Sequence, residues 1–144
     1  MKTAKLILAV ALTASLGFAA VRADDDDDAA AKPAKLPPAS TKTGVTFDND
    51  IKPIIQESCV KCHDSKGTKK PKGGLALDTR DGVMKGGRDG TVVTVGDSAH
   101  SDLVWAVAHI GDDSDTFMPK GKNAKMLTPD QIGLIRAWID QGAK

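Results

Sequence analysis

Both cysteines of this chain lie in one five-residue segment, Cys59-Val60-Lys61-Cys62-His63. Residues three and four positions apart share one face of a helical turn, so two thiols and an imidazole are placed together. Two thiols at this spacing can form thioether bonds with the vinyl groups of a porphyrin, and the imidazole can bind its iron as an axial ligand. The segment therefore predicts covalent attachment of a c-type haem, and with it a fold built around a porphyrin.

Other uses of these residues are weighed against haem. The cysteine pair could form a disulfide or a redox-active dithiol of the thioredoxin type, although it is expected at a helix end and not between a strand and a helix. It could also give zinc two thiolates and an imidazole, but a closed structural site needs a fourth ligand. No second cysteine pair exists, and His100 and His109 are the only other histidines. Haem attachment is the favoured interpretation.

The first 23 residues have the pattern of a secretory signal peptide. Lys2 and Lys5 form a basic start, residues 6–20 are apolar, and Val21-Arg22-Ala23 offers small residues where a signal peptidase reads. The apolar stretch is short for a membrane span, and no cysteine follows it to accept a lipid. We expect cleavage after Ala23 and a periplasmic protein with no stable membrane span in its mature chain. A retained N-terminal anchor is the alternative.

Residues 24–44 are predicted to be a disordered, acidic and proline-rich linker. The aspartates at 24–28 repel one another and stay solvated, and the residues after them include few large apolar side chains. Cleavage would remove three of the 20 basic residues and none of the 19 acidic ones. A slightly acidic mature chain gives no reason to expect a nucleic-acid partner.

Residues 45–144 are enough for one small domain, which is predicted to be all-α because no βαβ rhythm or run of strands is present. Helices are expected over about 49–62, 101–109 and 128–142. Between the first two lies a Gly-rich stretch, 67–96, in which residues 91–95 form either a short strand or a loop. Aromatic residues are 3 % of the chain and tyrosine is absent. The apolar side chains alone are few for a core of this size, and a buried porphyrin would supply the missing bulk.

Local signals mark the ends of two of these helices. The first starts at Asp48 or Asn49 and tolerates Pro53 because this proline falls in the first turn. The last starts at Thr128, which forms a capping box with Gln131.

The second axial position of the iron has several candidate ligands: Met84, His100, His109, Met118 and Met126. Met118 precedes a proline in the polar loop 111–125, and proline disfavours a helical conformation at the residue before it. An extended Met118 can reach across the distal face with its sulfur, and thioether plus imidazole ligation raises the reduction potential. The alternatives are that Met118 is a core residue, or that His100 or His109 is the ligand. Met126 is expected to pack at the entry of the last helix.

At these residues the chain resembles the class I type cytochromes c, and specifically the cytochrome c domain of planctomycete-type bacterial proteins. The similarity covers about residues 45–144. It rests on an ordered series of segments: Phe47 with Ile51-Lys52-Pro53-Ile54, 59–63, 73–80, Gly86-Gly87, Gly96-Asp97, Ser101 with Leu103, Met118-Pro119, and 138–143. The resemblance implies a class I cytochrome c fold, in which three main helices wrap one covalently attached haem and long Gly-rich loops complete the domain.

The resemblance also implies roles for individual residues. Cys59 and Cys62 would carry the thioethers, His63 and Met118 would bind the iron, and Arg80 would pair with a haem propionate. For Arg80 the alternative is an exposed salt bridge with a neighbouring aspartate. Two departures from the family pattern are Val95, where a proline usually precedes Gly96, and Lys120, where a second proline is common after Pro119.

These residues predict an electron carrier and not an enzyme. Iron with a strong ligand on each face has no open position for a substrate and is suited to transferring single electrons between redox partners. Lysines at 66, 69, 70 and 72 and at 120, 122 and 125 would border the haem edge and attract a partner with an acidic docking face, unless they are only scattered solvated charge. If Met118 does not bind the iron, a haem enzyme or a gas or peroxide sensor is the alternative, and a haem-free thiol–disulfide protein is a third.

Overall fold

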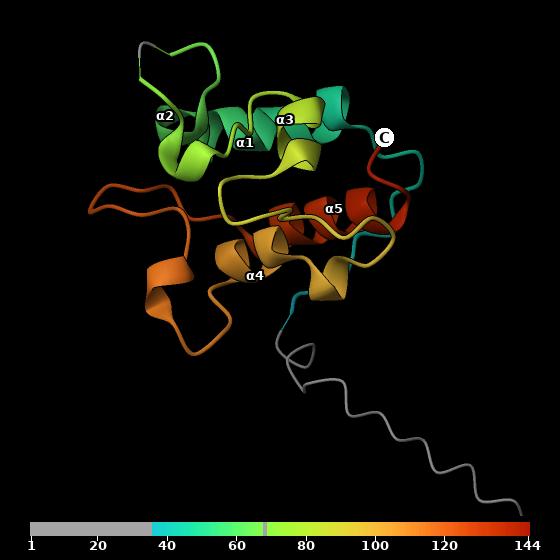
Figure 1. The fold of residues 1–144 in the computed structure, drawn as a ribbon. Helices are drawn as coiled ribbons and strands as arrows, with labels where there is room; N and C mark the ends of the chain where they lie inside the picture. The colour runs from blue at the N-terminus through green and yellow to red at the C-terminus, as the bar shows by residue number, and fades with distance from the viewer. Residues whose placement is uncertain (1–35, 68) are drawn as a thin grey trace, which may run out of the picture.

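The structure is a computed structural model that describes residues 36–67 and 69–144. The described residues form five α-helices joined by loops (Figure 1): α1 (Lys52–Ser58), α2 (Val60–His63), α3 (Arg80–Lys85), α4 (Asp102–Ala108) and α5 (Pro129–Asp140). They contain no strand, only an isolated bridge between Gly87 and Gly90. The predicted all-α class is confirmed to this extent. The predicted signal peptide lies outside the described residues.

The helix predicted over 49–62 is divided into three parts. It begins as a π-helical turn, Phe47–Ile51, and continues as α1 and α2. Cys59 separates α1 from α2, since its φ of −120° leaves the helical region. Pro53 falls in the first turn of α1, as expected, where a proline is tolerated.

The predicted cap of this first helix is wrong. Neither Asp48 nor Asn49 precedes the first turn, which follows Thr46, and no side chain caps it in the usual way. Asp50 instead reaches back, and its carboxylate accepts the N–H of Thr46 at 2.9 Å. The N–H of Thr46, the residue before the helix, is thus hydrogen-bonded by an acidic side chain from within the first turn.

The ends of α5 follow the local signals. The Thr128 hydroxyl accepts the N–H of Gln131 and the Gln131 side chain accepts the N–H of Thr128, which completes the capping box. Gly142, with φ of +97°, ends the helix in the left-handed region. The apolar residue that packs at its entry is Leu127, which is 8 % exposed, and not Met126, which is 50 % exposed.

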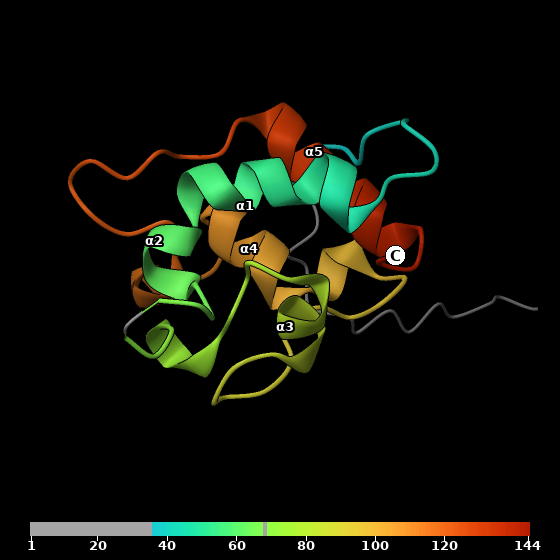
Figure 2. The same cartoon turned by 90° about the horizontal axis from the view of Figure 1, so that it is seen from above.

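The core lies between the first helical run, α4 and α5 (Figures 1 and 2). The rings of Phe47 and Trp138 pack at a centroid distance of 5.7 Å, and α4 packs against α5. The apolar residues that recur at helical spacing along these elements are buried: Phe47, Ile51, Ile54, Ile55, Leu103, Val104, Val107, Ile132, Ile135, Trp138 and Ile139. The Gly-rich stretch contains α3, which the sequence pattern did not predict, and residues 91–95 form a loop.

The predicted linker needs correction for residues 36–44, which pack on α5. The N–H of Ser40 donates to the carbonyl of Gly133 at 2.8 Å, and the side-chain amide of Gln141 donates to the carbonyl of Lys42 at 2.8 Å. A Cβ on Gly133 would lie 2.6 Å from the Pro38 carbonyl oxygen, so glycine permits this close approach. Composition failed here because the segment contributes main-chain groups to these hydrogen bonds, and every residue type possesses such groups.

Within the described residues, no helix combines the length and the apolar character that are needed to cross a bilayer.

Candidate functional site

Two adjoining hollows in the described part of the chain, of about 240 and 460 Å³, have lining residues in common. Both are lined by His63 from the end of α2 and by Met118 from the loop before α5. Protein sites for cofactors usually measure about 300–1,000 Å³ and are largely apolar. The apolar side chains that line the two hollows include Leu75, Val92, Leu103, Trp105, Val107 and Ile110. The structure therefore brings the two predicted iron ligands, which are 55 positions apart along the chain, to one cavity.

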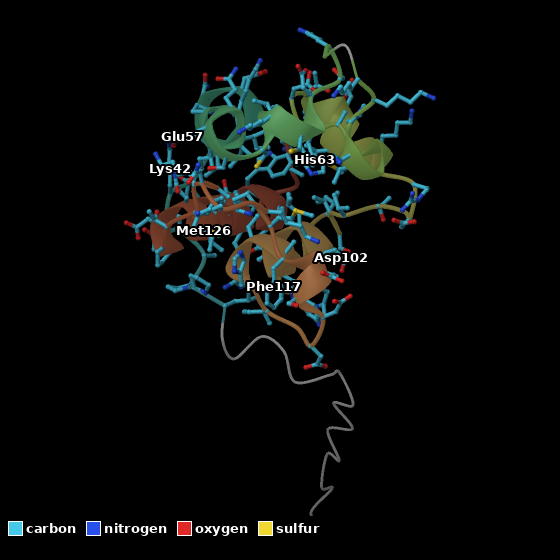
Figure 3. The ribbon with its side chains drawn as sticks, turned by 90° about the vertical axis from the view of Figure 1, so that its left-hand side faces the viewer. Lys42, Glu57, His63, Asp102, Phe117 and Met126 are labelled. Carbon is cyan, nitrogen blue, oxygen red and sulfur yellow. The ribbon has the colours of Figure 1, made fainter. Side chains whose placement is uncertain are left out.

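His63 is held at the cavity by the segment that follows the Gly-rich turn at Lys72–Gly74. Its Nδ1 atom lies 2.9 Å from the carbonyl oxygen of Leu75, and its own carbonyl accepts the N–H of Leu77 at 2.8 Å. A carbonyl oxygen can only accept, so Nδ1 carries the proton and Nε2 keeps a free lone pair. Figure 3 shows the His63 ring on the inner side of its helix, toward the rest of the molecule. This tautomer is the one that a histidine needs in order to bind a metal through Nε2.

The two cysteines lie on the same turn as His63 and both are free thiols. The N–H groups of Cys62 and His63 both donate to the carbonyl of Cys59, at 3.1 and 3.0 Å. Burial raises the pKa of the Cys59 thiol to about 11. Redox-active thiols have lowered pKa values, because the thiolate is the nucleophile, so this environment disfavours the thiol–disulfide interpretation. No group of three or more His, Cys, Asp or Glu side chains comes together in the described residues to complete a zinc site.

Met118 is attached to the C-terminal end of α4. Its N–H donates to the carbonyl of Ala106, and its carbonyl oxygen accepts from Nε2 of His109, each at 2.9 Å. The ring of His109 stacks on the ring of Phe117, with centroids 5.0 Å apart and planes 9° apart. The loop that carries Met118 is thus anchored next to the cavity.

The other candidate ligands lie elsewhere. Nδ1 of His100 pairs with the carboxylate of Asp97 at 2.7 Å, and His109 is engaged with the Met118 carbonyl, so neither lines the cavity. Met84 packs against the hydrophobic core, and Met126 is exposed and does not line the cavity. Met118 is the candidate that joins His63 at the cavity.

Residues 59–121 match the family model described as Planctomycete cytochrome C. This segment is a c-type cytochrome domain of that family. The matched residues start at the cysteine motif and include Met118, so the recognised domain contains both sides of the cavity.

A curated relative of the cytochrome c domain is the hydrazine synthase subunit alpha of Kuenenia stuttgartiensis. The two are 31 % identical over 123 residues, which cover 69 % of this chain and 15 % of that subunit. The chain thus spans a small part of this relative. No solved structure matches the chain.

The residues at the cavity fit the haem that the cytochrome c family implies. Two free thiols lie on one helical turn, the imidazole beside them keeps Nε2 free, and a thioether lies on the same apolar cavity. This donor set is the chemistry of a c-type haem site.

The structure does not place Arg80 at this cavity. Its Nε atom donates to the carbonyl of Ala143 at 2.6 Å, and its guanidinium lies 3.6 Å from the carboxylate of Asp81. The basic residues that line the cavity are Lys72, one of the lysines predicted to border the haem edge, and Arg88, for which the sequence predicted no role. Lys72 precedes Gly73-Gly74 and Arg88 follows Gly86-Gly87, two glycine pairs among the segments on which the family resemblance rests. Their position beside these pairs is the sequence feature that could have indicated a place at the cavity.

Proposed function

We propose that this chain is an exported monohaem cytochrome c that transfers single electrons between redox partners. One haem would be attached through Cys59 and Cys62 in a class I cytochrome c fold, with His63 and Met118 as axial ligands. The observation that carries the proposal is the common cavity lined by His63 and Met118, with the free thiols beside one of its walls.

The residues of the chain have separate tasks in this proposal. A bound haem supplies a one-electron iron couple. His63 presents Nε2, with its ring orientation set by the Leu75 carbonyl. Met118 would offer its sulfur as the second iron ligand, which would leave no open position for a substrate. The apolar lining would limit the access of water to the haem, and a thioether ligand raises the reduction potential.

Export to the periplasm is part of the proposal and is supported by the signal-peptide pattern at residues 1–23. The lysines at 66, 69, 70 and 72, and those at 120, 122 and 125, are exposed in the structure. They flank the cysteine motif and Met118 along the chain, which supports docking of a redox partner with an acidic face.

A haem enzyme or a sensor with an open distal position is the second candidate. The observation that favours it is the similarity to part of a protein whose name is that of a synthase subunit. The two candidate functions differ in one property, which is whether Met118 coordinates the iron.

Absorption spectra of the purified periplasmic protein, oxidised and reduced, test the proposal. Covalent haem with the spectrum of two thioether bonds, a sulfur-to-iron charge-transfer band in the oxidised state and no carbon monoxide binding in the reduced state are the expected results. Rapid and complete carbon monoxide binding at neutral pH would contradict the electron-carrier proposal and support a haem enzyme or sensor. Absence of covalent haem would overturn both.

A further inference from the structure

Met118 is held from both sides of its main chain by the end of α4. Its N–H donates to Ala106 and its carbonyl accepts from His109, both at 2.9 Å. Elsewhere in the loop 111–125 main-chain hydrogen bonds are local, such as those from Thr116 to Asp113 and from Ala124 to Gly121. The contact with α4 therefore sets where Met118 lies relative to the cavity wall that carries His63.

His109 has an unusual backbone for its contribution to this contact. It ends α4 in the left-handed conformation, with φ of 55° and ψ of 46°. Glycine is the residue that this position favours, because a side chain disfavours the left-handed region. Glycine would have no ring to donate to the Met118 carbonyl or to stack on Phe117. The side chain thus makes two contacts with the methionine loop from a position where the backbone alone would favour glycine.

We propose that His109 is a positioning residue for Met118, which fixes the loop so that the sulfur stays on the iron. The inference rests on the function proposed above. The Met118 carbonyl can only accept, so His109 donates from Nε2 and acts through the main chain of the ligand, without touching the iron. Removal of the ring leaves Met118 in place in the sequence but frees its loop.

The test is a titration of the oxidised holoprotein with imidazole, which competes with Met118 for the iron. Loss of the sulfur-to-iron band against imidazole concentration gives an apparent affinity, and this affinity rises with the population in which Met118 has left the iron. His109→Gly removes the ring and suits the left-handed backbone. His109→Gln keeps a side-chain N–H donor. His100→Gln removes a histidine that pairs with Asp97, away from the cavity, and is the matched control.

The expected result for His109→Gly is an apparent imidazole affinity at least about five-fold above that of the wild type, the effect of losing one net hydrogen bond. His109→Gln should recover most of the wild-type affinity, and His100→Gln should equal the wild type. An affinity of His109→Gly within two-fold of the wild type would overturn the inference. A wild-type protein that has covalent haem but no charge-transfer band would instead refute methionine ligation itself, and the inference with it. Thermal unfolding of each variant, followed by circular dichroism, checks that the titrated protein is folded.

Discussion

The Nδ1 atom of His63 lies 2.9 Å from the carbonyl oxygen of Leu75, 12 residues further along the chain. This hydrogen bond joins the helix with the cysteine motif to the segment that leaves the Gly-rich turn. It fixes both the rotation of the imidazole and the nitrogen that carries its proton. Because the acceptor is a main-chain atom, the orientation of the ring depends on the path of residues 72–77.

Replacement of His63 by glycine should remove the proximal ligand and leave space for imidazole in solution. We expect His63→Gly to keep covalent haem on its two cysteines but to lose the low-spin spectrum of the wild type. Added imidazole should restore much of that spectrum, since the apolar walls of the cavity remain. Absorption spectra at increasing imidazole concentration measure this. An unchanged spectrum in His63→Gly would mean that another residue binds the iron.

Replacement of Met118 by alanine should abolish the charge-transfer band, lower the reduction potential and open the reduced iron to carbon monoxide. Met126→Ala is the matched control, since Met126 is a methionine that is 50 % exposed and does not line the cavity. Redox titration and carbon monoxide binding check both variants. Equal behaviour of the two would exclude Met118 as the distal ligand.

Charge reversal at Lys69 and Lys70 should change the rate of electron exchange with charged reagents. We expect the double variant Lys69→Glu/Lys70→Glu to slow oxidation by anionic ferricyanide by about two- to five-fold at low ionic strength, and the difference to shrink at high salt because charges are screened. Stopped-flow kinetics at two salt concentrations measure it, with exposed Lys85 reversed as the control. A rate independent of salt and of these two charges would remove the proposed steering.

Acid should weaken the contact between Asp78 and Ser65. Partial burial of Asp78 acts to raise the pKa of its carboxyl, but the side-chain and main-chain hydrogen bonds from Ser65 outweigh it, so the pKa lies below its ordinary value of 3.8. The stabilisation is therefore complete above pH 3.8 and is lost as the pH falls through the lowered pKa. Asp78→Asn should be less stable than the wild type at pH 7, and the two should converge in acid. Denaturant unfolding from pH 7 down to pH 3 checks this, and a constant difference across the range would contradict it.

Alanine at Gly133 should destabilise the protein although it lies inside a helix. The added Cβ would meet the Pro38 carbonyl oxygen at 2.6 Å, and overpacking of this kind costs about 1–3 kcal/mol, more than the roughly 1 kcal/mol that alanine gains over glycine in a helix.

Deletion of residues 30–40 should reverse the sign of this substitution, because the obstructing carbonyl is then gone. The measurement is the free energy of unfolding of the wild type and of Gly133→Ala, each with and without residues 30–40. The same effect of Gly133→Ala with and without the segment would show that the segment does not pack on α5.

Local patterns predicted the parts of the fold that depend on neighbouring residues. The capping box of Thr128 and Gln131 is made within four residues, so the start of α5 could be inferred without a fold. The divided first helix could not be inferred, because helical spacing continues across Cys59 while the backbone does not. The short helix α3 could not be predicted from the sequence pattern, because six residues show little periodicity. It also begins after Thr79, within a Gly-rich stretch.

The sequence by itself determined the cysteine motif, the all-α class and the apolar faces of the helices, because each is carried by residues a few positions apart. Only the tertiary structure decided which candidate ligand shares a cavity with His63, since that depends on where the loop 111–125 meets α4. Tertiary contacts also placed Arg80 against the Ala143 carbonyl and residues 36–44 on α5. These placements depend on main-chain carbonyls from distant segments, which every residue type possesses and which therefore leave no mark in a pattern of side chains.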